Sequence, residues 1–354
     1  EVRQEDAATL VIRGGLRPRG DRLHIGESGL ATRLFTPVAA LCNTPIRIEG
    51  EGSILDRPMR MMVEPLRSLG VEITDTKGYL PIRVCGPMRG GEAAVDGSVS
   101  SQFITGLLLA LPRAAEDTTL YVRRAVSTPY LDMTLDTAGR FGIEISQRDY
   151  EEFYIPGGQH YEATDFAIEG DWSAAAMLLV MGATAGEITV RNVSMLSKQA
   201  DTAICTALVR AGAAVIHEGD TVTAAHRPLQ AFEFDATNCP DLFPALAALA
   251  AAADGVSVLH GTSRLTYKEC NRADAIRDEY ARLGIEVDTS EENVMKIRGG
   301  AVHGADVSSH NDHRMAMSLA VAALRADGAV TIRGAESVAK SYPEFFEALE
   351  QVRI

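Results

Sequence analysis

A recurring pattern of apolar and polar positions runs along the chain. Four segments share it: an apolar run with helical spacing, then a glycine, then a short alternation rich in β-branched residues. The glycines are Gly70, Gly142, Gly212 and Gly284, at steps of 72, 70 and 72 residues. Each suits the left-handed residue that ends a helix before a strand begins. The pattern therefore predicts a repeat of about 70 residues.

A second series, in step with the first, marks polar positions that open apolar helical stretches. These openings are Gly29, Ser101, Ser173, Asp241 and His313, at steps of 72, 72, 68 and 72 residues. Small and apolar residues follow each opening, which predicts buried helices packed closely at alanine and glycine. Glycine turns that recur by chance are the alternative, and the agreement of two series argues against it.

Pieces rich in β-branched residues separate the predicted helices, at 45–48, 119–122 and 329–332. Each repeat thus combines two helices with strands, which predicts an α/β fold made of α+β repeats. The period exceeds that of common solenoids, so a few copies building each of two domains fit better than a stacked array. We expect domains at 1–169 and 170–354. Extended backwards from Gly70, the period predicts a further repeat before residue 1.

Charge and composition argue against several partners. The net charge of −14 disfavours nucleic acid and anionic membranes, which bind basic surfaces. No apolar run approaches the length of about 18 residues that a membrane span needs, and the first residues lack the features of a secretory signal. Five widely spaced cysteines without a C-x-x-C motif fit reduced thiols. We expect a cytoplasmic protein that binds anions only through local cations.

Two of the helix openings are candidate anion sites, because helix N-termini carry unpaired N–H groups. One is the glycine loop 26–29, and the other is 96–102, which holds adjacent Ser100 and Ser101 followed by Gln102. Neither matches the patterns of nucleotide-binding loops. A serine at a helix start is also a common N-cap, so both readings stay open for each loop.

Five cations occupy similar turns: Arg57, Lys268, Arg272, Arg314 and Lys340. Their recurrence at predicted helix openings suggests one pocket for a polyanion, with Lys268 and Arg272 on one helix face, although solvated surface charges are the alternative for any one of them.

His310 and His313 form a possible metal pair. The chain offers only Asp312 as a nearby third ligand, so we expect no metal.

Three motifs resemble signatures of the 5-enolpyruvylshikimate-3-phosphate synthase family of enolpyruvyl transferases. They are 97–103 (GSVSSQF), Lys268-Glu269 with Arg272, and 311–317 (NDHRMAM). The resemblance extends over essentially the whole chain, through 56–58, 127–130, 157–159, 169–171 and 340–343. It implies two domains of three repeats each that close on substrate between them. The expected repeat before residue 1 would be the first, and would carry a further substrate-binding lysine.

The resemblance also implies site residues. For shikimate 3-phosphate they are Ser100, Ser101, Gln102, Ser127, Tyr130, Asp241 and Lys268, with the three serines at the phosphate. For phosphoenolpyruvate they are Gly29, Arg57, Gln102, Arg272, Arg314 and Lys340.

The implied reaction belongs to aromatic amino-acid biosynthesis. It adds the 5-hydroxyl to phosphoenolpyruvate and then eliminates phosphate from a tetrahedral intermediate, which requires an acid and a base that exchange roles. We assign Asp241 to the hydroxyl proton and Glu269 to the methylene carbon, with Lys268 and the lysine of the expected preceding repeat as rivals, and His313 to positioning. The resemblance implies no metal, nucleotide or redox cofactor, and a monomer.

Several positions depart from the family pattern. Leu30 replaces a usual Thr and Glu27 a usual Asn in the glycine loop, from which we expect weakened binding of the inhibitor glyphosate. Arg264 stands where an Asn that binds substrate is usual, which leaves one ring contact in doubt.

Two rival functions stay open. UDP-N-acetylglucosamine enolpyruvyl transferase usually carries a reactive cysteine where this chain has Gly52, and the absence of that cysteine disfavours it. The other rival is a non-catalytic relative that has kept the fold.

Overall fold

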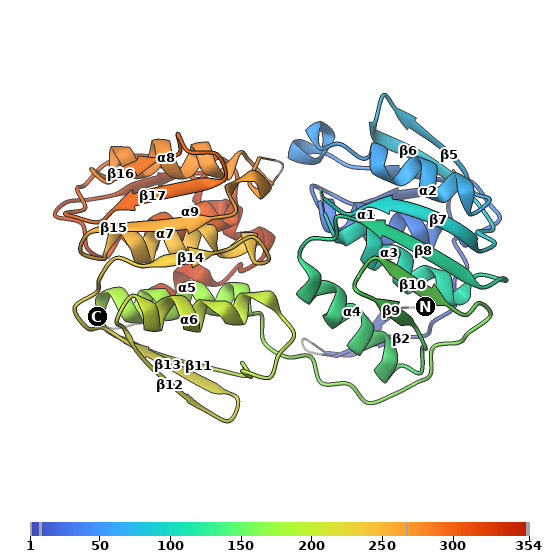
Figure 1. Cartoon of the computed structure of the whole chain (residues 1–354), viewed down its shortest axis with the longest axis horizontal. Coiled ribbons are helices and arrows are strands. Elements are labelled where there is room, and N and C mark those ends of the chain that lie inside the picture. The colour runs from blue at the N-terminus through green and yellow to red at the C-terminus, as the bar shows by residue number, and fades with distance from the viewer. Residues whose placement is uncertain (1, 7–8, 99, 267, 352–354) are drawn as a thin grey trace. The chain divides into compact units, whose positions relative to one another are not determined.

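The computed structural model describes residues 2–6, 9–98, 100–266 and 268–351, and its backbone forms two compact units (Figure 1). The first compact unit comprises Glu1–Ala125 and Thr134–Ala163, and the second Val126–Met133 and Thr164–Ile354. A boundary at 169/170 would leave residues 126–133 in the first unit, whereas their contacts group them with the second. In the part of the chain that the structure describes, no helix has the length and apolar character needed to cross a membrane.

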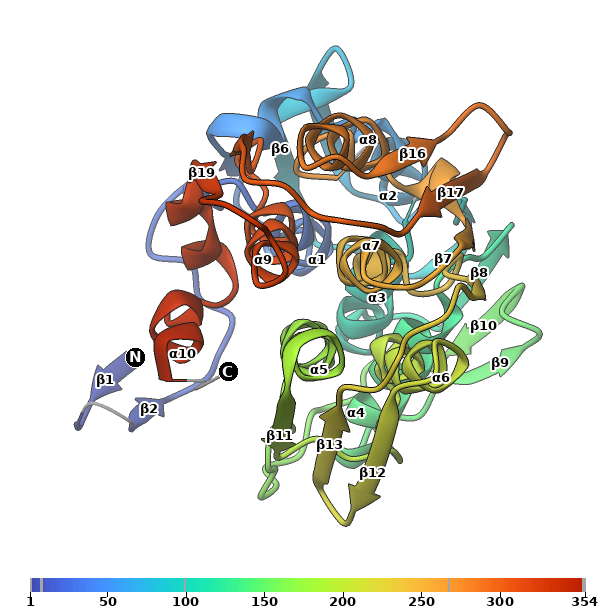
Figure 2. The ribbon, with the colours of Figure 1, turned by 90° about the vertical axis from the view of Figure 1, so that its left-hand side faces the viewer.

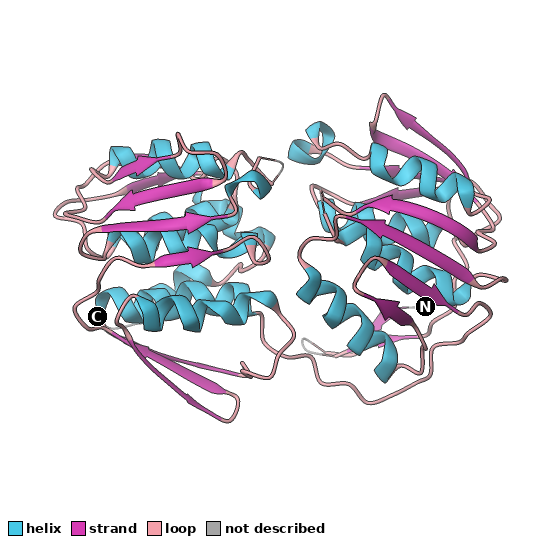
Figure 3. Ribbon diagram, viewed as in Figure 1, coloured by secondary structure: helices cyan, strands magenta, loops and turns pink. Residues whose placement is uncertain are grey.

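Three four-stranded sheets share one arrangement: a parallel pair followed by an antiparallel hairpin whose second strand lies inside (Figure 3). In spatial order the first is β3 (Arg22–His24), β4 (Ile46–Glu49), β6 (Tyr79–Cys85) and β5 (Glu72–Thr76). The second is β7 (Gly91–Asp96), β8 (Thr118–Arg123), β10 (Glu152–Ile155) and β9 (Ser146–Arg148). The third, in the second compact unit, is β14 (Glu233–Asp235), β15 (Val256–His260), β17 (Val294–Arg298) and β16 (Glu286–Asp288).

The remaining sheets are partial versions of this arrangement or short ribbons. An antiparallel sheet has the order β11 (Glu187–Arg191), β13 (Thr221–Ala225) and β12 (Ala214–Glu218). A parallel pair joins β18 (Asp306–Ser308) to β19 (Thr331–Arg333), and an antiparallel pair joins β1 (Val2–Gln4) to β2 (Leu10–Ile12). The common strand order makes the recurring unit visible, and the predicted mixed α+β fold is confirmed.

Helices connect the strands in a regular way. A crossover helix joins the two strands of each parallel pair, because parallel neighbours cannot be linked by a tight turn. These crossover helices are α1 (Gly29–Ala39), α3 (Gln102–Ala110), α7 (Phe243–Ala251) and α9 (His313–Ala323). The others are α2 (Val63–Ser68), α4 (Thr128–Arg140), α5 (Trp172–Ala185), α6 (Ile204–Arg210), α8 (Arg272–Arg282) and α10 (Phe345–Gln351).

The four repeated glycines adopt the predicted left-handed conformation. Gly70, Gly142, Gly212 and Gly284 have φ angles of 83°, 80°, 90° and 85°. In every case the amide of the next residue donates to the carbonyl five positions before it, as Ile285 N does to Tyr280 O at 2.9 Å. Only glycine takes this backbone conformation without strain. The prediction that these residues end α2, α4, α6 and α8 is confirmed.

The second series of predicted openings also coincides with helix starts. α1 begins at Gly29 and α9 at His313, and α3 and α5 begin within one residue of their openings. Asp241 lies in a short 3-10 helix, Pro240–Leu242, that leads into α7.

The predicted burial of these helices at small residues is also confirmed. A Cβ atom on Gly106 of α3 would stand 2.5 Å from the carbonyl oxygen of Arg33 in α1, so the two helices pack backbone to backbone at that point.

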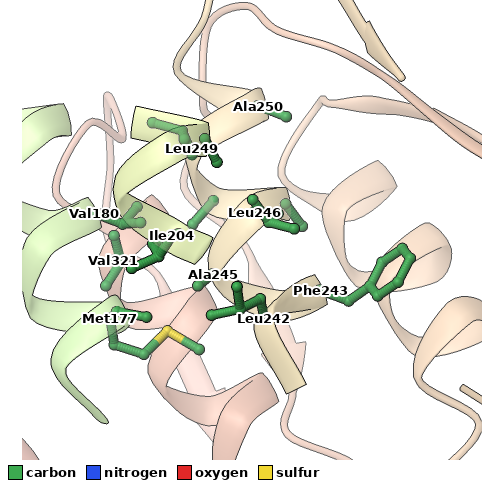
Figure 4. Packing of buried hydrophobic residues seen from close by; sticks show 14 of the residues in the cluster. Met177, Val180, Ile204, Leu242, Phe243, Ala245, Leu246, Leu249, Ala250 and Val321 are labelled. Carbon is green, nitrogen blue, oxygen red and sulfur yellow. The ribbon is translucent and has the colours of Figure 1, made fainter. Parts of the chain in front are cut away.

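Three of these helices form the core of the second compact unit. α5, α7 and α9 pack against one another and are seen end-on in Figure 2. Every residue of α7 is buried. Figure 4 shows Leu246 and Leu249 of α7 beside Val180 of α5 and Ile204 of α6, in the same buried cluster as Val321 of α9. The polar residues that begin these helices are thereby held on a rigid base.

Candidate functional site

The polar side chains of the second compact unit gather around one buried arginine. Arg272 is the first residue of α8, and its side chain is 1% exposed. Its Nε donates to Asp312 Oδ2, its Nη1 to Asp241 Oδ1 and its Nη2 to Glu269 Oε2, each at 2.7 Å. Burial alone would lower the pKa of Arg272, but the three carboxylates raise it well above the ordinary value. Arg272 thus organises three acidic side chains into one cluster.

Asp241 faces two further cations. Lys268 Nζ donates to Asp241 Oδ1 at 3.0 Å, and Arg314 Nη2 lies 3.6 Å from Asp241 Oδ2. Burial disfavours the ionised carboxylate, yet Lys268, Arg314 and Arg272 together hold the pKa of Asp241 well below its usual value. Asp241 is therefore an anion over the physiological range of pH.

Lys268 and Arg314 differ in their response to this environment. Burial lowers the pKa of Lys268, and Asp241 only partly restores it. The pKa of Arg314 is raised, because the carboxylate of Asp241 outweighs the effect of burial. Lys268 is therefore the cation of this cluster that loses a proton more readily.

A second carboxylate, Asp201, lies beside this cluster. Its Oδ2 accepts hydrogen bonds from the hydroxyls of Tyr130 and Ser173, both at 2.9 Å, and the residue is 2% exposed. Burial and the nearby charge of Asp241 raise the pKa of Asp201. The same causes, with Asp201 itself, raise the pKa of Tyr130, so its hydroxyl keeps its proton and donates.

Ser127, which precedes α4, is buried beside this group. Its backbone is left-handed, with φ of 54°, and its amide donates to Asn238 Oδ1 at 3.1 Å. This contact holds Ser127 and Tyr130 in the second compact unit.

His313 occupies the first turn of α9, which Asp312 caps by accepting from Arg314 N at 2.9 Å. Burial, together with the charge of Arg314, lowers the pKa of His313 to about 4. Its imidazole is therefore neutral at pH 7. Near it, burial and Asp312 raise the pKa of the Cys270 thiol to about 12, which makes Cys270 a poor nucleophile.

Lys340 and Arg264 complete the cations of this unit. Lys340 Nζ donates to the backbone carbonyl of Asn311 at 2.9 Å. Arg264 ends the short 3-10 helix Thr262–Arg264 and is half-buried. Burial lowers the pKa of Arg264, and the charge of Asp241 opposes this, so its guanidinium belongs to the same electrostatic cluster.

In the first compact unit, α1 and α3 hold a second group of predicted residues. Arg33 is 2% exposed, and its Nη1 donates to Gln102 Oε1 at 2.9 Å. Ser100 Oγ accepts from Gln102 N at 3.2 Å, and Ser101 is buried. Val99, within the same motif, lies outside the described residues.

The glycine loop packs against Arg57. A Cβ on Gly29 would stand 2.6 Å from Arg57 Nη1, so only glycine leaves room for this guanidinium. Glu27 Oε2 accepts from the amide and hydroxyl of Ser53, both at 3.2 Å. Ser28 Oγ accepts from Ala31 N at 3.0 Å, so this serine is an N-cap, the alternative that the sequence left open.

Two details of the predicted cation arrangement were wrong. Lys268 and Arg272 do not share a helix face, because Asn271 caps α8 and the helix begins only at Arg272. They meet at Asp241 instead, through the loop that precedes the helix. Arg57 and Lys340 lie at the ends of the 3-10 helices Gly52–Asp56 and Ala335–Lys340, not at helix openings.

Sequence reasoning missed the roles of Arg33, Asp201 and Asp312 as partners of site residues. Arg33 follows Gly29 by four positions, so helical spacing alone could have flagged it. Asp201 carries no motif signal. Asp312 stood within a motif but was considered only as a metal ligand. Among the residues that the structure describes, no three side chains of His, Cys, Asp or Glu are grouped to hold a metal ion.

Comparisons with known proteins agree over the length of the chain. Residues 1–349 match the family model for EPSP synthase (3-phosphoshikimate 1-carboxyvinyltransferase). The 3-phosphoshikimate 1-carboxyvinyltransferase of Methanoculleus marisnigri is 38% identical over 92% of this chain and 78% of its own length. That of Aeropyrum pernix is 37% identical over 96% of this chain and 79% of its own. The structure of EPSP synthase from Acinetobacter baumannii superposes with a TM-score of 0.82 at 26% identity, covering 99% of this chain and 84% of that one.

Fold, site and relatives together define a transferase of small anionic substrates. More particularly, the chain belongs to the EPSP synthase (3-phosphoshikimate 1-carboxyvinyltransferase) family.

Proposed function

We propose that the protein transfers the enolpyruvyl group of phosphoenolpyruvate to the 5-hydroxyl of shikimate 3-phosphate and releases phosphate, a step of aromatic amino-acid biosynthesis. The observation that carries this proposal is Asp241, an ionised carboxylate held among Lys268, Arg272 and Arg314. A base surrounded by cations is what the addition of a hydroxyl to an anionic enol phosphate needs.

The cations suit phosphoenolpyruvate, which carries both a carboxylate and a phosphate. Arginine forks bind such groups through two parallel hydrogen bonds. We assign this substrate to Arg272, Arg314 and Lys340 in the second unit, and to Gly29, Arg57 and Gln102 in the first. Arg272 donates to three carboxylates in this structure, so a bidentate contact with substrate would require it to exchange at least one of these hydrogen bonds.

Neutral donors suit the phosphate of shikimate 3-phosphate, because an excess of fixed cations there would compete with the other substrate. We assign Ser100, Ser101 and Ser127 to this phosphate, and Gln102 and Tyr130 to the ring. Asp241 and Lys268 would meet the ring hydroxyls. The hydrogen bond between Lys268 and Asp241 supports their joint role.

For the proton transfers, Asp241 is the proposed base for the 5-hydroxyl, and Glu269 the group that protonates the methylene carbon. Lys268 is the alternative donor, and its lowered pKa supports that alternative because release of its proton is eased. The neutral imidazole of His313 fits a positioning role.

The UDP-sugar enzyme is disfavoured by Gly52. This residue has φ of 62°, and a Cβ there would stand 2.5 Å from the carboxyl carbon of Glu27. A cysteine at this position would be strained and crowded. A non-catalytic relative is disfavoured by the satisfied contacts of Asp241, Lys268 and Glu269.

We further propose a cytoplasmic monomer. The five cysteines, all of them within the described residues, have free thiols, which supports a reducing compartment.

A phosphate-release assay with shikimate 3-phosphate and phosphoenolpyruvate tests the reaction. We expect Asp241→Asn to lower kcat by about 10²- to 10⁴-fold, the usual contribution of a general base. The exposed Asp235, which accepts from Thr237 N, supplies the matched control Asp235→Asn.

The assay should also be run on a chimera in which the part of a relative that lies outside the match is joined to this chain. Phosphate release by neither chain would refute the proposed reaction.

A further inference from the structure

A strained loop connects β18 to α9 in the second compact unit. Two consecutive residues in it, His310 and Asn311, have φ angles of 52° and 58°. Residues other than glycine seldom adopt this left-handed conformation, and two in a row persist only when their surroundings hold them. Within the loop, His310 N donates to Ser308 Oγ and Asn311 N to Ser309 Oγ, each at 3.1 Å, and contacts from outside the loop add to this hold.

Glu279 of α8 provides such a hold. This carboxylate is 4% exposed, and its two oxygens are directed at the loop. Oε1 binds His310 Nε2 at 2.7 Å, and Oε2 accepts from Ser308 N at 3.0 Å and lies 3.4 Å from Nε of Arg282 in the same helix. One buried side chain therefore binds the loop at its backbone and at its strained residue. Glu279 has no role in the reaction proposed above.

The loop matters because of what it presents. The carbonyl of Asn311 accepts from Lys340 Nζ at 2.9 Å, and Asp312 both binds Arg272 and caps the helix that carries Arg314. All three cations assigned to phosphoenolpyruvate in this unit thus depend on the same few residues. Glu279 lies seven residues after Arg272, so α8 holds the loop at two points, two turns apart.

We propose that Glu279 and His310 are positioning residues, which hold the loop 308–312 in its left-handed turn and thereby place Lys340 and Arg314 for phosphoenolpyruvate. This inference rests on the proposed function for its substrate, but not for the loop geometry. The two parts are therefore measured separately.

The geometry is tested by hydrogen–deuterium exchange of peptides that span 308–312, without substrate. Glu279→Leu removes both hydrogen bonds at similar volume, and we expect exchange of the loop to accelerate about tenfold or more. Glu279→Gln keeps an acceptor for Ser308 N and a polar partner for His310, so it should stay near the parent. Asp278→Asn, on the exposed face of the same helix, is the matched control. Unchanged loop exchange in Glu279→Leu would overturn the proposal.

The consequence for substrate is tested by steady-state kinetics. We expect Glu279→Leu to raise the KM for phosphoenolpyruvate about tenfold while the KM for shikimate 3-phosphate moves less than about twofold, with recovery in Glu279→Gln. A parallel rise in both KM values would indicate general loosening and contradict the positioning role. If the parent chain shows no turnover, the proposed function fails, while the exchange measurement still decides the geometry.

A pair of substitutions at His310 keeps the proposal decidable if Glu279→Leu does not fold. His310→Gly tolerates the left-handed backbone, whereas His310→Ala does not. Both lose the contact with Glu279. We expect loop exchange to rise in the order parent, His310→Gly, His310→Ala. Equal exchange in all three chains would show that neither the contact nor the strain matters.

Discussion

At the scale of single residues, the site is built on compensation of buried charge. Arg272 donates hydrogen bonds to three carboxylates, whose negative charge exceeds its own positive charge. Lys268 and Arg314, which both contact Asp241, offset this excess. A buried charge left without its partner costs several kcal/mol, so these side chains depend on one another. The same compensation keeps Asp241 ionised and ready to accept a proton.

The lowered pKa of His313 leads us to expect that the stability of the protein depends on pH. Its pKa is about 4 in the folded chain against an ordinary value of 6.5, so the unfolded chain binds the additional proton between these values. The stabilising contribution is therefore complete above pH 6.5 and is lost as pH falls toward 4. We expect it to be about 2 kcal/mol smaller at pH 5 than at pH 7.

Urea unfolding of the parent and of His313→Gln at both values of pH isolates this contribution, because other titrating groups cancel in the difference. A difference that does not change with pH would contradict the assignment.

Glu27 and Leu30 predict the response to glyphosate, an anionic inhibitor. Glu27 adds a negative charge to the loop that packs against Gly52 and Ser53, and Leu30 follows the glycine that makes room for Arg57. We expect Glu27→Asn and Leu30→Thr each to tighten inhibition, by up to about tenfold where the charge is removed.

Inhibition constants measured against phosphoenolpyruvate test this, with Leu55→Thr, another exposed leucine, as the control. Tight inhibition of the parent chain, equal to that of the double variant, would refute the prediction.

At the level of secondary-structure elements, the repeat is seen in how the helices begin and end. Each of α2, α4, α6 and α8 ends on a left-handed glycine, and each crossover helix begins near a polar residue of the site or its partner. The left-handed glycine that ends one helix also allows the chain to turn into the next strand. The crossover helix that follows then places another polar N-terminus at the same end of the unit. Repetition of this helix end and helix start therefore brings the polar residues of the site together.

We expect substitution by alanine to lower the free energy of unfolding more at Gly284 than at Gly212. At Gly212 a Cβ meets nothing nearer than 3.4 Å, so only the left-handed backbone opposes it, at about 1 to 2 kcal/mol. At Gly284 a Cβ would also stand 2.5 Å from the ring of His303, so the loss should be larger. Gly300, with open space and no positive φ, should change by less than about 0.5 kcal/mol.

Free energies of unfolding from urea titration test the ranking within one compact unit. Equal losses at all three glycines would contradict the conformational explanation.

At the scale of the whole molecule, two compact units are joined by an exposed segment. Residues 164–169 are exposed and lack regular structure. We therefore retain two domains as a proposal, with the boundary in this segment. Since residues 126–133 belong to the second unit, the chain passes between the units more than once.

Limited proteolysis tests this organisation. We expect a glutamate-specific protease to cut first at Glu162 or Glu169, since exposed segments without regular secondary structure are cleaved preferentially. Two fragments of similar size should then resist further digestion. Glu169→Gln combined with Glu162→Gln is the control and should slow the first cut. Early cleavage inside α5 or α7 would contradict the boundary.

The local features of this protein can be read from its amino-acid pattern. Helix ends at the four glycines, helix starts at the polar openings and the alternation of helix with strand all depend on neighbours a few residues away, which a pattern records. The motifs likewise identified Lys268, Arg272 and Arg314, and the series of helix openings identified Asp241, before their contacts were known.

The contacts between residues far apart along the chain could be found only from the folded structure. Arg33 reaches Gln102, Tyr130 reaches Asp201, and Glu279 reaches His310 across 69, 71 and 31 residues. Lys268 meets Asp241 from a loop, where helical spacing had predicted a shared face with Arg272. Such contacts depend on how buried helices pack, and packing is set by the fit of many side chains at once, which no local pattern contains.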